Sequence, residues 1–313
     1  MSSLSSLQIH QTNEWGLTTL MLACDVGADR RIIEMLIDAG SEMEARDSHL
    51  GFTALHHAAY WQQLEAVEVL LSRGSEINGK SDNGWTPLHF AANATPEWTD
   101  GVKELMKHSA VEVNPRNEDG QTPLHWACDR GYLHTVELLL GHNGIDANVV
   151  NNKGDTPLHV AVQRQRYNIV SKMLIQFGEE LKLGNEERCS GVVVASYLAH
   201  HGANFYCKNK IGRTPLDLIE KENFKKTLKT LFRPTQCVFC EDEVATETFF
   251  PCKHLSLCKK CCPQKIPKRC PTCGQKITSK NSLVGPNSSN MEVQMVAGPV
   301  GEYEITVPNY VIP

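Results

Sequence analysis

A short pattern of apolar and polar residues recurs six times in the first two thirds of the chain. In each copy a glycine lies two positions before a threonine, and a buried-type apolar residue follows two positions after it. Threonine side chains cap helix N-termini, and proline fits the first helical position. The pattern therefore predicts a turn and then a short helix beginning at each of six threonines, Thr18, Thr53, Thr86, Thr122, Thr156 and Thr214.

A second helix is predicted in each unit. Fourteen residues after the threonine, apolar residues begin a stripe spaced i, i+3, i+4, which is typical of one helix face. One such stripe is too small to hold a fold alone, so neighbouring units must stack to complete a core. The stripes are Val67, Leu70, Leu71; Val136, Leu139, Leu140; Val170, Met173, Leu174; and Leu228, Leu231, Phe232.

The spacing of the units is regular except at one place. Successive threonines are 35, 33, 36, 34 and 58 residues apart, so the last step exceeds one period. Val194, Tyr197 and Leu198 resemble the end of a second helix, which suggests an insert near residues 179–195 before a duplicated half-unit. A degenerate full repeat in the same stretch is the alternative, and the sequence leaves both open.

The units resemble the repeats of the ankyrin family. Its motif Thr-Pro-Leu-His-x-Ala is intact at residues 86–91, 122–127 and 156–161, and the resemblance covers residues 13–233. The resemblance implies a mostly α-helical solenoid that binds a protein partner through its turn tips and first helices. That surface maps to residues 82–83, 117–119 and 151–153, with Trp61 and Arg130 as candidate substrate-binding residues. We expect the histidine that recurs once per repeat to be structural.

Eight metal-binding side chains lie close together after the repeats. Three pairs of cysteines, each separated by two residues, accompany one Cys-x-His pair. Thiolate and imidazole groups at this spacing favour zinc over disulfides, and eight ligands suffice for two closed tetrahedral sites. The predicted ligands are Cys237, Cys240, Cys252, His254, Cys258, Cys261, Cys270 and Cys273.

The order of these ligands resembles the RING finger, and its compactness resembles the RINGs of mind bomb ligases and inhibitor-of-apoptosis proteins. The resemblance covers residues 237–279 and implies two interleaved sites, one formed by Cys237, Cys240, Cys258 and Cys261, the other by Cys252, His254, Cys270 and Cys273. It also implies that a ubiquitin-conjugating enzyme (E2) binds against Val238, Ile266 and Pro271. A RING has no catalytic nucleophile, because it acts by positioning the ubiquitin-loaded enzyme.

Net charge and composition limit the partners and the cellular location that we expect for the protein. The 31 Lys and Arg residues and 36 Asp and Glu residues give a formal charge of −5, which does not favour nucleic-acid binding by the whole chain. No apolar run reaches the ~18 residues of a membrane span, so we expect no membrane insertion and a cytoplasmic, or also nuclear, protein. Residues 1–12 should be a flexible N-terminus, and residues 280–313, with three glutamates and many Ser, Asn, Gly and Pro residues, a disordered tail.

Two functional hypotheses follow. The first is a RING-type E3 ubiquitin ligase whose ankyrin repeats bind the substrate while the RING recruits the E2. The alternative is a non-enzymatic adaptor whose zinc domain only docks another protein. Gly274 favours the alternative, because many RINGs carry a basic or polar side chain at this position after the last cysteine.

Overall fold

A computed structural model describes residues 9, 11–163, 191–220, 222–232, 247–250, 254–257 and 279–282. The chain divides into two compact units. One comprises residues 1–234 and 283–286, and the other comprises residues 235–282 and 287–313. Most of the predicted tail and the N-terminal residues 1–8 lie outside the described residues.

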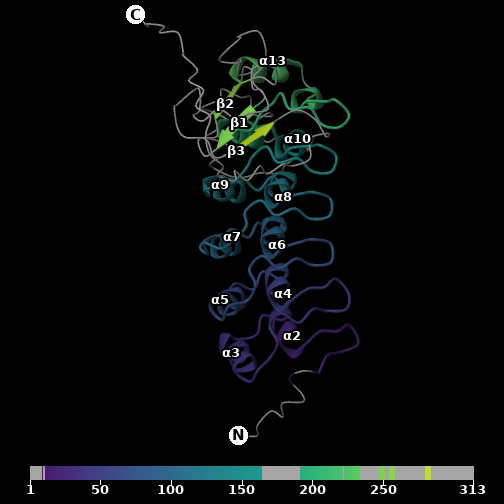
Figure 1. Cartoon of the computed structure of the whole chain (residues 1–313), viewed down its shortest axis with the longest axis vertical. Coiled ribbons are helices and arrows are strands. Elements are labelled where there is room, and N and C mark those ends of the chain that lie inside the picture. Colours follow the sequence, from purple (N-terminus) through teal and green to yellow (C-terminus); the bar gives the residue numbers. More distant parts are fainter. Residues whose placement is uncertain are drawn as a thin grey trace, which may run out of the picture. The chain divides into compact units, whose positions relative to one another are not determined.

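The first unit is a stack of helix pairs (Figure 1). The first helices contact one another in succession, and so do the second helices, which makes two parallel columns. The first column contains α2 (Thr19–Asp25), α4 (Ala54–Tyr60), α6 (Pro87–Asn93), α8 (Pro123–Arg130), α10 (Pro157–Gln163) and the 3-10 helix η1 (Pro215–Leu218). The second contains α3 (Arg30–Asp38), α5 (Leu64–Ser72), α7 (Thr99–Met106), α9 (Leu133–Gly141), α12 (Gly191–His200) and α13 (Glu222–Leu231).

The predicted threonine caps are present in the structure. Thr18 and Thr122 have extended backbones, and their side chains accept hydrogen bonds from the backbone N–H of Met21 (3.2 Å) and His125 (3.4 Å). Proline follows at the first helical position of α6 and α8, where no intrahelical N–H bond is lost. In these two repeats, residues of the motif itself therefore satisfy backbone groups at the start of the first helix.

Each recurring histidine joins one repeat to the next. Its Nδ1 accepts from the backbone N–H of its own threonine at 3.1 Å, so Nε2 carries the proton in the neutral ring. The Nε2–H groups of His56, His89, His125 and His159 donate to backbone carbonyls of the following repeat, at Trp85 (3.1 Å), Gln121 (3.0 Å), Asp155 (3.0 Å) and Arg213 (3.1 Å). These contacts confirm a structural role for the four histidines.

One continuous hydrophobic core runs through the stack. It contains the leucine of each motif, for example Leu88 and Leu124, and the inward stripe of each second helix, for example Leu70 and Leu139. Neighbouring turns approach closely, because a Cβ on Gly84 would lie 3.1 Å from Cα of Asn117, and Gly84 has a φ of +74°. Glycine meets both requirements. The predicted mostly α-helical repeat solenoid is confirmed.

α12 packs against α10 and α9 as a second helix does in the other repeats. Asn148 bonds to Gly202 (3.0 Å) and Asn204 (2.9 Å), as Asn114 bonds to the corresponding residues one repeat earlier. Residues 191–195, which the sequence suggested as part of an insert, therefore belong to α12. The predicted stripe at Val170, Met173 and Leu174 lies outside the described residues.

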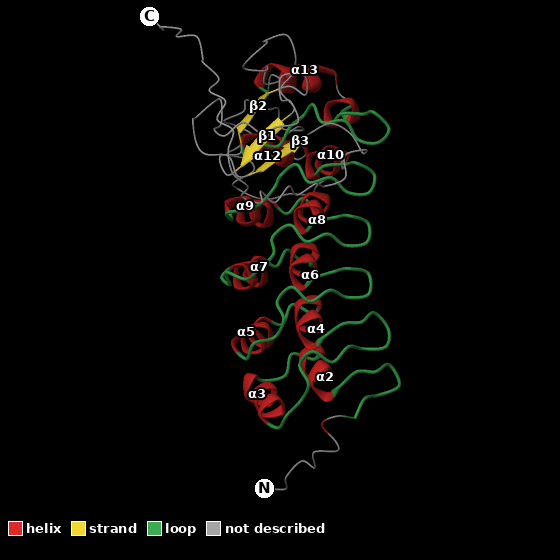
Figure 2. Cartoon of the chain, viewed as in Figure 1, coloured by secondary structure: helices red, strands yellow, loops and turns green. Residues whose placement is uncertain are grey.

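The second unit contains a small antiparallel sheet (Figure 2). Its strands are β1 (Glu247–Phe250), β2 (His254–Leu257) and β3 (Ser279–Ser282), in the order β2-β1-β3. Phe249 pairs with His254 and Phe250 with Ser279. The predicted disordered tail therefore begins too early, because residues 280–282 pair with β1.

The predicted flexible N-terminus also ends too late. Ile9 is buried, and Thr12 forms an isolated antiparallel bridge with Thr18. An apolar side chain and a backbone bridge hold this stretch against the first repeat.

The buried histidines predict a loss of array stability in mild acid. Burial lowers the pKa of His56, His89 and His125 to about 4 and also lowers the pKa of His159. Histidine in the unfolded chain titrates near 6.5, so the unfolded state binds more protons as the pH falls from about 6.5 toward 4. His56, His89 and His125 should each remove roughly 1–2 kcal/mol of stability between pH 7 and 5.

The variant His125→Gln tests this expectation. Urea unfolding followed by helical circular dichroism should show a lower stability at pH 7, by about 1–3 kcal/mol, because a buried hydrogen bond is perturbed. Between pH 7 and 5 the variant should lose about 1–2 kcal/mol less than the wild type, because one titrating group is gone. Parallel pH profiles for the two proteins would contradict the proton linkage.

Candidate functional sites on the array and the zinc domain

Aromatic side chains line the first helices of the second to fourth repeats. We call Phe52, Tyr60, Trp85, Phe90 and Trp126 the aromatic row. Ring centroids are 4.9 Å apart for Phe52 and Phe90, 4.9 Å for Trp85 and Phe90, and 4.7 Å for Trp85 and Trp126. Trp85 and Trp126 are half-buried, so the row packs the repeats together and also presents apolar surface.

Trp61, predicted from the sequence as a substrate contact, is well placed to extend this surface. It caps the C-terminus of α4 and is 52% exposed, as is Tyr60. The two rings meet edge to face at 5.1 Å, and Tyr60 contacts Phe90 at 5.7 Å. Trp61 therefore adjoins the aromatic row and leaves half of its surface open to a partner.

Arg130, the other predicted substrate residue, is engaged within the array. It is the last residue of α8, is half-buried, and its Nε donates to Oδ1 of Asn93 at 2.6 Å. This bond links the fourth repeat to the third. The structure does not bring Arg130 and Trp61 together, because α6 lies between their helices. Their roles in substrate binding stay predictions.

A cavity of about 580 Å³ opens between the fifth and sixth repeats, and sequence reasoning missed it. Three cations line it, Lys153, Lys210 and Arg213, together with the carboxylate of Asp155. Asp155 is buried, and its Oδ1 accepts from Nδ2 of Asn209 at 2.8 Å. We call this the basic cavity. Only Lys153 lay within the predicted turn-tip surface, and comparing equivalent positions across repeats would have revealed the other two cations.

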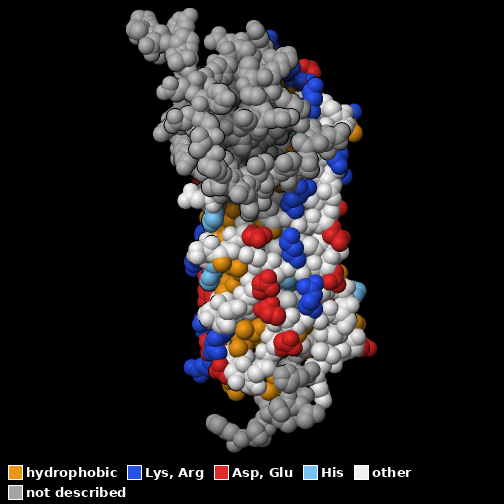
Figure 3. All heavy atoms as spheres, in the orientation of Figure 1, with side chains coloured by type: hydrophobic (Ala, Val, Ile, Leu, Met, Phe, Trp, Pro, Cys, Tyr) orange, Lys and Arg blue, Asp and Glu red, His pale blue; other side chains and the backbone are white. Residues whose placement is uncertain are grey.

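The turn tips change charge along the array. Asp82, Glu118 and Asp119 occupy the tips of the third and fourth repeats, whereas Lys153 and Lys210 occupy equivalent positions in the fifth and sixth. Acidic and basic side chains are interspersed on the face that Figure 3 shows.

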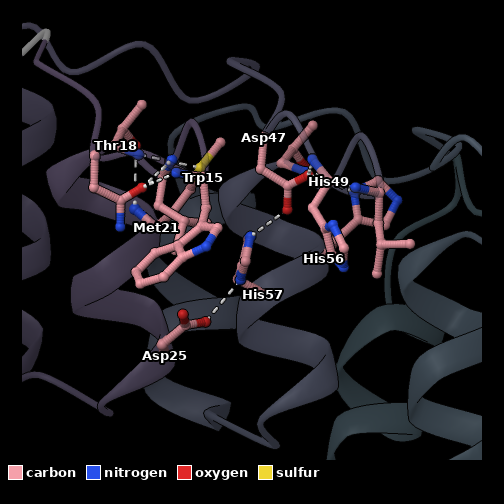
Figure 4. A network of polar contacts seen from close by, with 12 residues as sticks. Trp15, Thr18, Met21, Asp25, Asp47, His49, His56 and His57 are labelled. Atoms are coloured by element: carbon pink, nitrogen blue, oxygen red, sulfur yellow. Dashed lines mark hydrogen bonds and ion pairs between the residues drawn. The ribbon is translucent and has the colours of Figure 1, made fainter.

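A buried histidine contact joins the first two repeats (Figure 4), and sequence reasoning missed it. Nδ1 of His57 lies 2.7 Å from Oδ1 of Asp25, and Nε2 lies 3.1 Å from Oδ2 of Asp47. His57 and Asp47 are buried, so the contact serves to hold the two repeats together.

Asp47 is adapted to this position. Burial by itself would raise the pKa of its carboxyl, but backbone N–H groups of Leu50 (2.8 Å) and His49 (3.0 Å), with His57 nearby, lower the pKa overall. The carboxylate also fixes the turn that leads into α4.

The cysteines of the array differ in kind from those of the predicted zinc domain. Burial raises the pKa of Cys24 and of Cys207 to about 12, and raises that of Cys128 as well. Thiols in such surroundings remain protonated and are poor nucleophiles and poor metal ligands. They serve as small core residues.

Of the eight predicted zinc ligands, His254 lies among the described residues, at the start of β2. The seven cysteines, and the predicted E2 contacts Val238, Ile266 and Pro271, lie outside them. The donor set fits zinc, because thiolates and imidazole are the ligands of closed tetrahedral zinc sites. The strand pairing of β1 with β2 and β3 holds His254 on a small sheet.

Fold and donor set together define an array of α-helical repeats followed by a small zinc finger. Family models match both parts. Ankyrin repeats match in overlapping segments at residues 3–81, 74–151, 97–185 and 135–241, and a C3HC4-type zinc finger (RING finger) matches residues 233–280. The chain belongs to the ankyrin-repeat family and carries a RING finger, which binds zinc, after its repeats.

Individual proteins show the same likeness. The chain is 28% identical over 136 residues to the E3 ubiquitin-protein ligase MIB2 of Gallus gallus, covering 31% of this chain and 14% of that protein. It is 35% identical over 79 residues to the tyrosine-protein kinase HTK16 of Hydra vulgaris, covering 25% and 10%. The matches thus span a small part of these relatives.

Among solved structures, the ankyrin repeat domain of Bcl-3 matches with a TM-score of 0.56 and 24% identity. The match covers 71% of this chain and 86% of that one, and it shows the fold. Within the described part of the chain, no helix is long and apolar enough to cross a membrane.

The two predicted substrate residues should differ in their effect on stability. Trp61→Ala removes a half-exposed side chain and should change the free energy of unfolding by no more than about 0.5 kcal/mol. Arg130→Ala removes the bond to Asn93 and should lower it by about 1–2 kcal/mol. Urea unfolding of both variants measures the difference, and equal losses would show that Trp61 also supports the fold.

Proposed function

We propose that this protein is a RING-type E3 ubiquitin-protein ligase. The observation that carries the proposal is the presence, in one chain, of ankyrin repeats and a C3HC4 RING finger. The likeness to MIB2, which is named as an E3 ubiquitin-protein ligase, supports it. In this proposal the repeats bind the protein substrate and the RING recruits the E2 that carries ubiquitin.

The proposed RING holds two zinc ions in interleaved sites. Cys237, Cys240, Cys258 and Cys261 would form one site. The other would consist of Cys252, His254, Cys270 and Cys273. Zinc in closed sites supplies folding free energy and performs no chemistry on the substrate.

Transfer of ubiquitin is proposed to depend on positioning. Val238, Ile266 and Pro271 would form the apolar contact with the E2, and a substrate lysine would attack the thioester of that enzyme directly. No residue of this chain forms a covalent intermediate in this scheme. Holding the thioester and the lysine together replaces a bimolecular encounter, which is a large source of rate acceleration.

The substrate would bind on the array, with Trp61 and Arg130 as contacts. The reaction would take place in the cytoplasm or also in the nucleus. A non-enzymatic adaptor is the second candidate, and Gly274 favours it because glycine has no side chain with which to bridge the E2 and ubiquitin. Incubating the purified chain with ubiquitin, activating enzyme, ATP and a panel of E2 enzymes separates the candidates. Chain formation above the level that each E2 reaches without this protein supports the ligase, and no increase with any E2 supports the adaptor.

The zinc content should be two ions per chain. Native mass spectrometry of wild-type protein should show this stoichiometry, and Cys240→Ala should show a loss of zinc. The variant should lose the structure of residues 237–279 while the array keeps its helical circular dichroism, because the metal contributes most of the folding free energy of so small a domain. One zinc ion or none in the wild type would contradict the ligand assignment.

Ligase activity should depend on Val238. The variant Val238→Arg should keep both zinc ions and lose chain formation by at least about 10-fold, because it places a charge in an apolar contact. The matched control Val300→Arg makes the same change outside the predicted RING and should retain activity. If Val238→Arg remains fully active with every E2 that works with the wild type, the predicted contact is wrong.

A further inference from the structure

We infer that the array binds an extended segment of its partner protein in which large apolar side chains are followed by clustered acidic residues. The apolar part would lie on the aromatic row and Trp61, and the acidic part in the basic cavity. The inference rests on the proposed function, since it names the class of substrate segment. It concerns a surface that the first unit forms by itself.

The aromatic row and the basic cavity lie on one face of the array. Arg213 directly precedes its threonine, as Phe52 and Trp85 precede theirs. Leu218, which also lines the cavity, follows its threonine by four residues, as Phe90 follows Thr86. Because first helices of successive repeats contact one another in register, equivalent positions form continuous lines along the stack.

The basic cavity has charge available for a ligand. Within the described part of the chain, Lys153, Lys210 and Arg213 form no ion pair with another residue. The one carboxylate in the lining, Asp155, already accepts a hydrogen bond from Asn209. Three exposed cations and one carboxylate thus line a cavity of about 580 Å³, which is large enough for acidic side chains. Their net positive charge favours carboxylate ligands, which arginine can bind with two parallel hydrogen bonds.

The other end of the face suits apolar side chains. Tyr60 and Trp61 are each 52% exposed, and they adjoin the half-buried Trp85 and Trp126 through Phe90. Exposed tyrosine and tryptophan side chains that are already held by their neighbours are favoured as anchors in protein interfaces.

The acidic turn tips fix the register of the bound segment. Glu118 and Asp119 repel acidic residues from the fourth repeat, whereas Lys153 and Lys210 attract them to the fifth and sixth. Asp82 of the third repeat is already paired with Arg46 at 2.8 Å. A segment that is acidic throughout, or apolar throughout, would therefore match only part of the surface. The combination of both kinds of side chain, in separate blocks, matches all of it.

A random 12-residue peptide library displayed on phage tests the inference on the full chain. Selection against the wild type should enrich peptides with a block of large apolar residues beside a block of Asp and Glu. The variant Lys153→Glu/Lys210→Glu should lose the acidic enrichment by about 10-fold or more while keeping the apolar enrichment. The matched control Lys226→Glu/Lys229→Glu makes the same charge change on exposed residues of α13 and should select peptides like those of the wild type.

The outcomes are separable. The inference is overturned if no peptides are enriched or if the enriched peptides lack the acidic block. It is also overturned if both double variants lose the acidic block equally, because that result indicates general charge attraction. Displacement of enriched peptides by a single-stranded oligonucleotide with equal affinity would assign the cavity to nucleic acid instead. Thermal unfolding confirms that the variants are folded. Chain formation without substrate, measured in the same preparations, tests the ligase proposal independently.

Discussion

The array depends on one hydrogen bond repeated along its length, from a buried neutral imidazole to a backbone carbonyl of the next repeat. No single repeat can bury its apolar stripe alone, so every repeat must be positioned accurately on its neighbour. The imidazole does this because its two nitrogens have opposite roles. Nδ1 of His89, for example, accepts from Thr86 in its own repeat, while Nε2–H donates to Gln121 in the next.

The first and sixth repeats lack this hydrogen bond to a next repeat, and each has another residue at the position of the histidine. Met21 takes the histidine position in the first repeat, and its sulfur receives the N–H of Thr18 at 3.4 Å. A thioether has no proton to donate onward. Asp217 takes the position in the sixth repeat and accepts from Thr214 at 3.0 Å and 2.7 Å. His57 connects the first two repeats in a different way. It belongs to the second repeat and contacts Asp25 of the first.

Sequence patterns predicted the repeats well because the same residues determine where a helix starts and how one repeat packs on the next. Thr122 caps its helix, Leu124 enters the core, and His125 joins repeats, so one motif determines three levels of structure. Apolar residues at helical spacing occur both near Val170, outside the described residues, and near Val194. Periodicity alone does not say which helix packs on which neighbour. The packing of α12 against α9 and α10 is shown by the structure.

Some candidate sites could be predicted from the sequence and others could not. Spacing along the chain was enough to propose the zinc ligands, because ligand pairs are close in sequence. The basic cavity was missed because Lys153 and Arg213 are far apart in sequence and are brought together by stacking of the fifth and sixth repeats. His57, Asp25 and Asp47 were missed for the same reason. Residues that meet across a repeat boundary leave no local pattern.

One bond between repeats is kept although the chain between its partners is longer than elsewhere. Nδ2 of Asn148 donates to the carbonyl oxygen of Gly202, 54 residues away, as Nδ2 of Asn114 donates to that of Gly144, 30 residues away. α12 packs against α9 and α10 as second helices do in the other repeats. The packing of a repeat array thus depends on which residues meet across a repeat boundary and not on the length of chain that joins them.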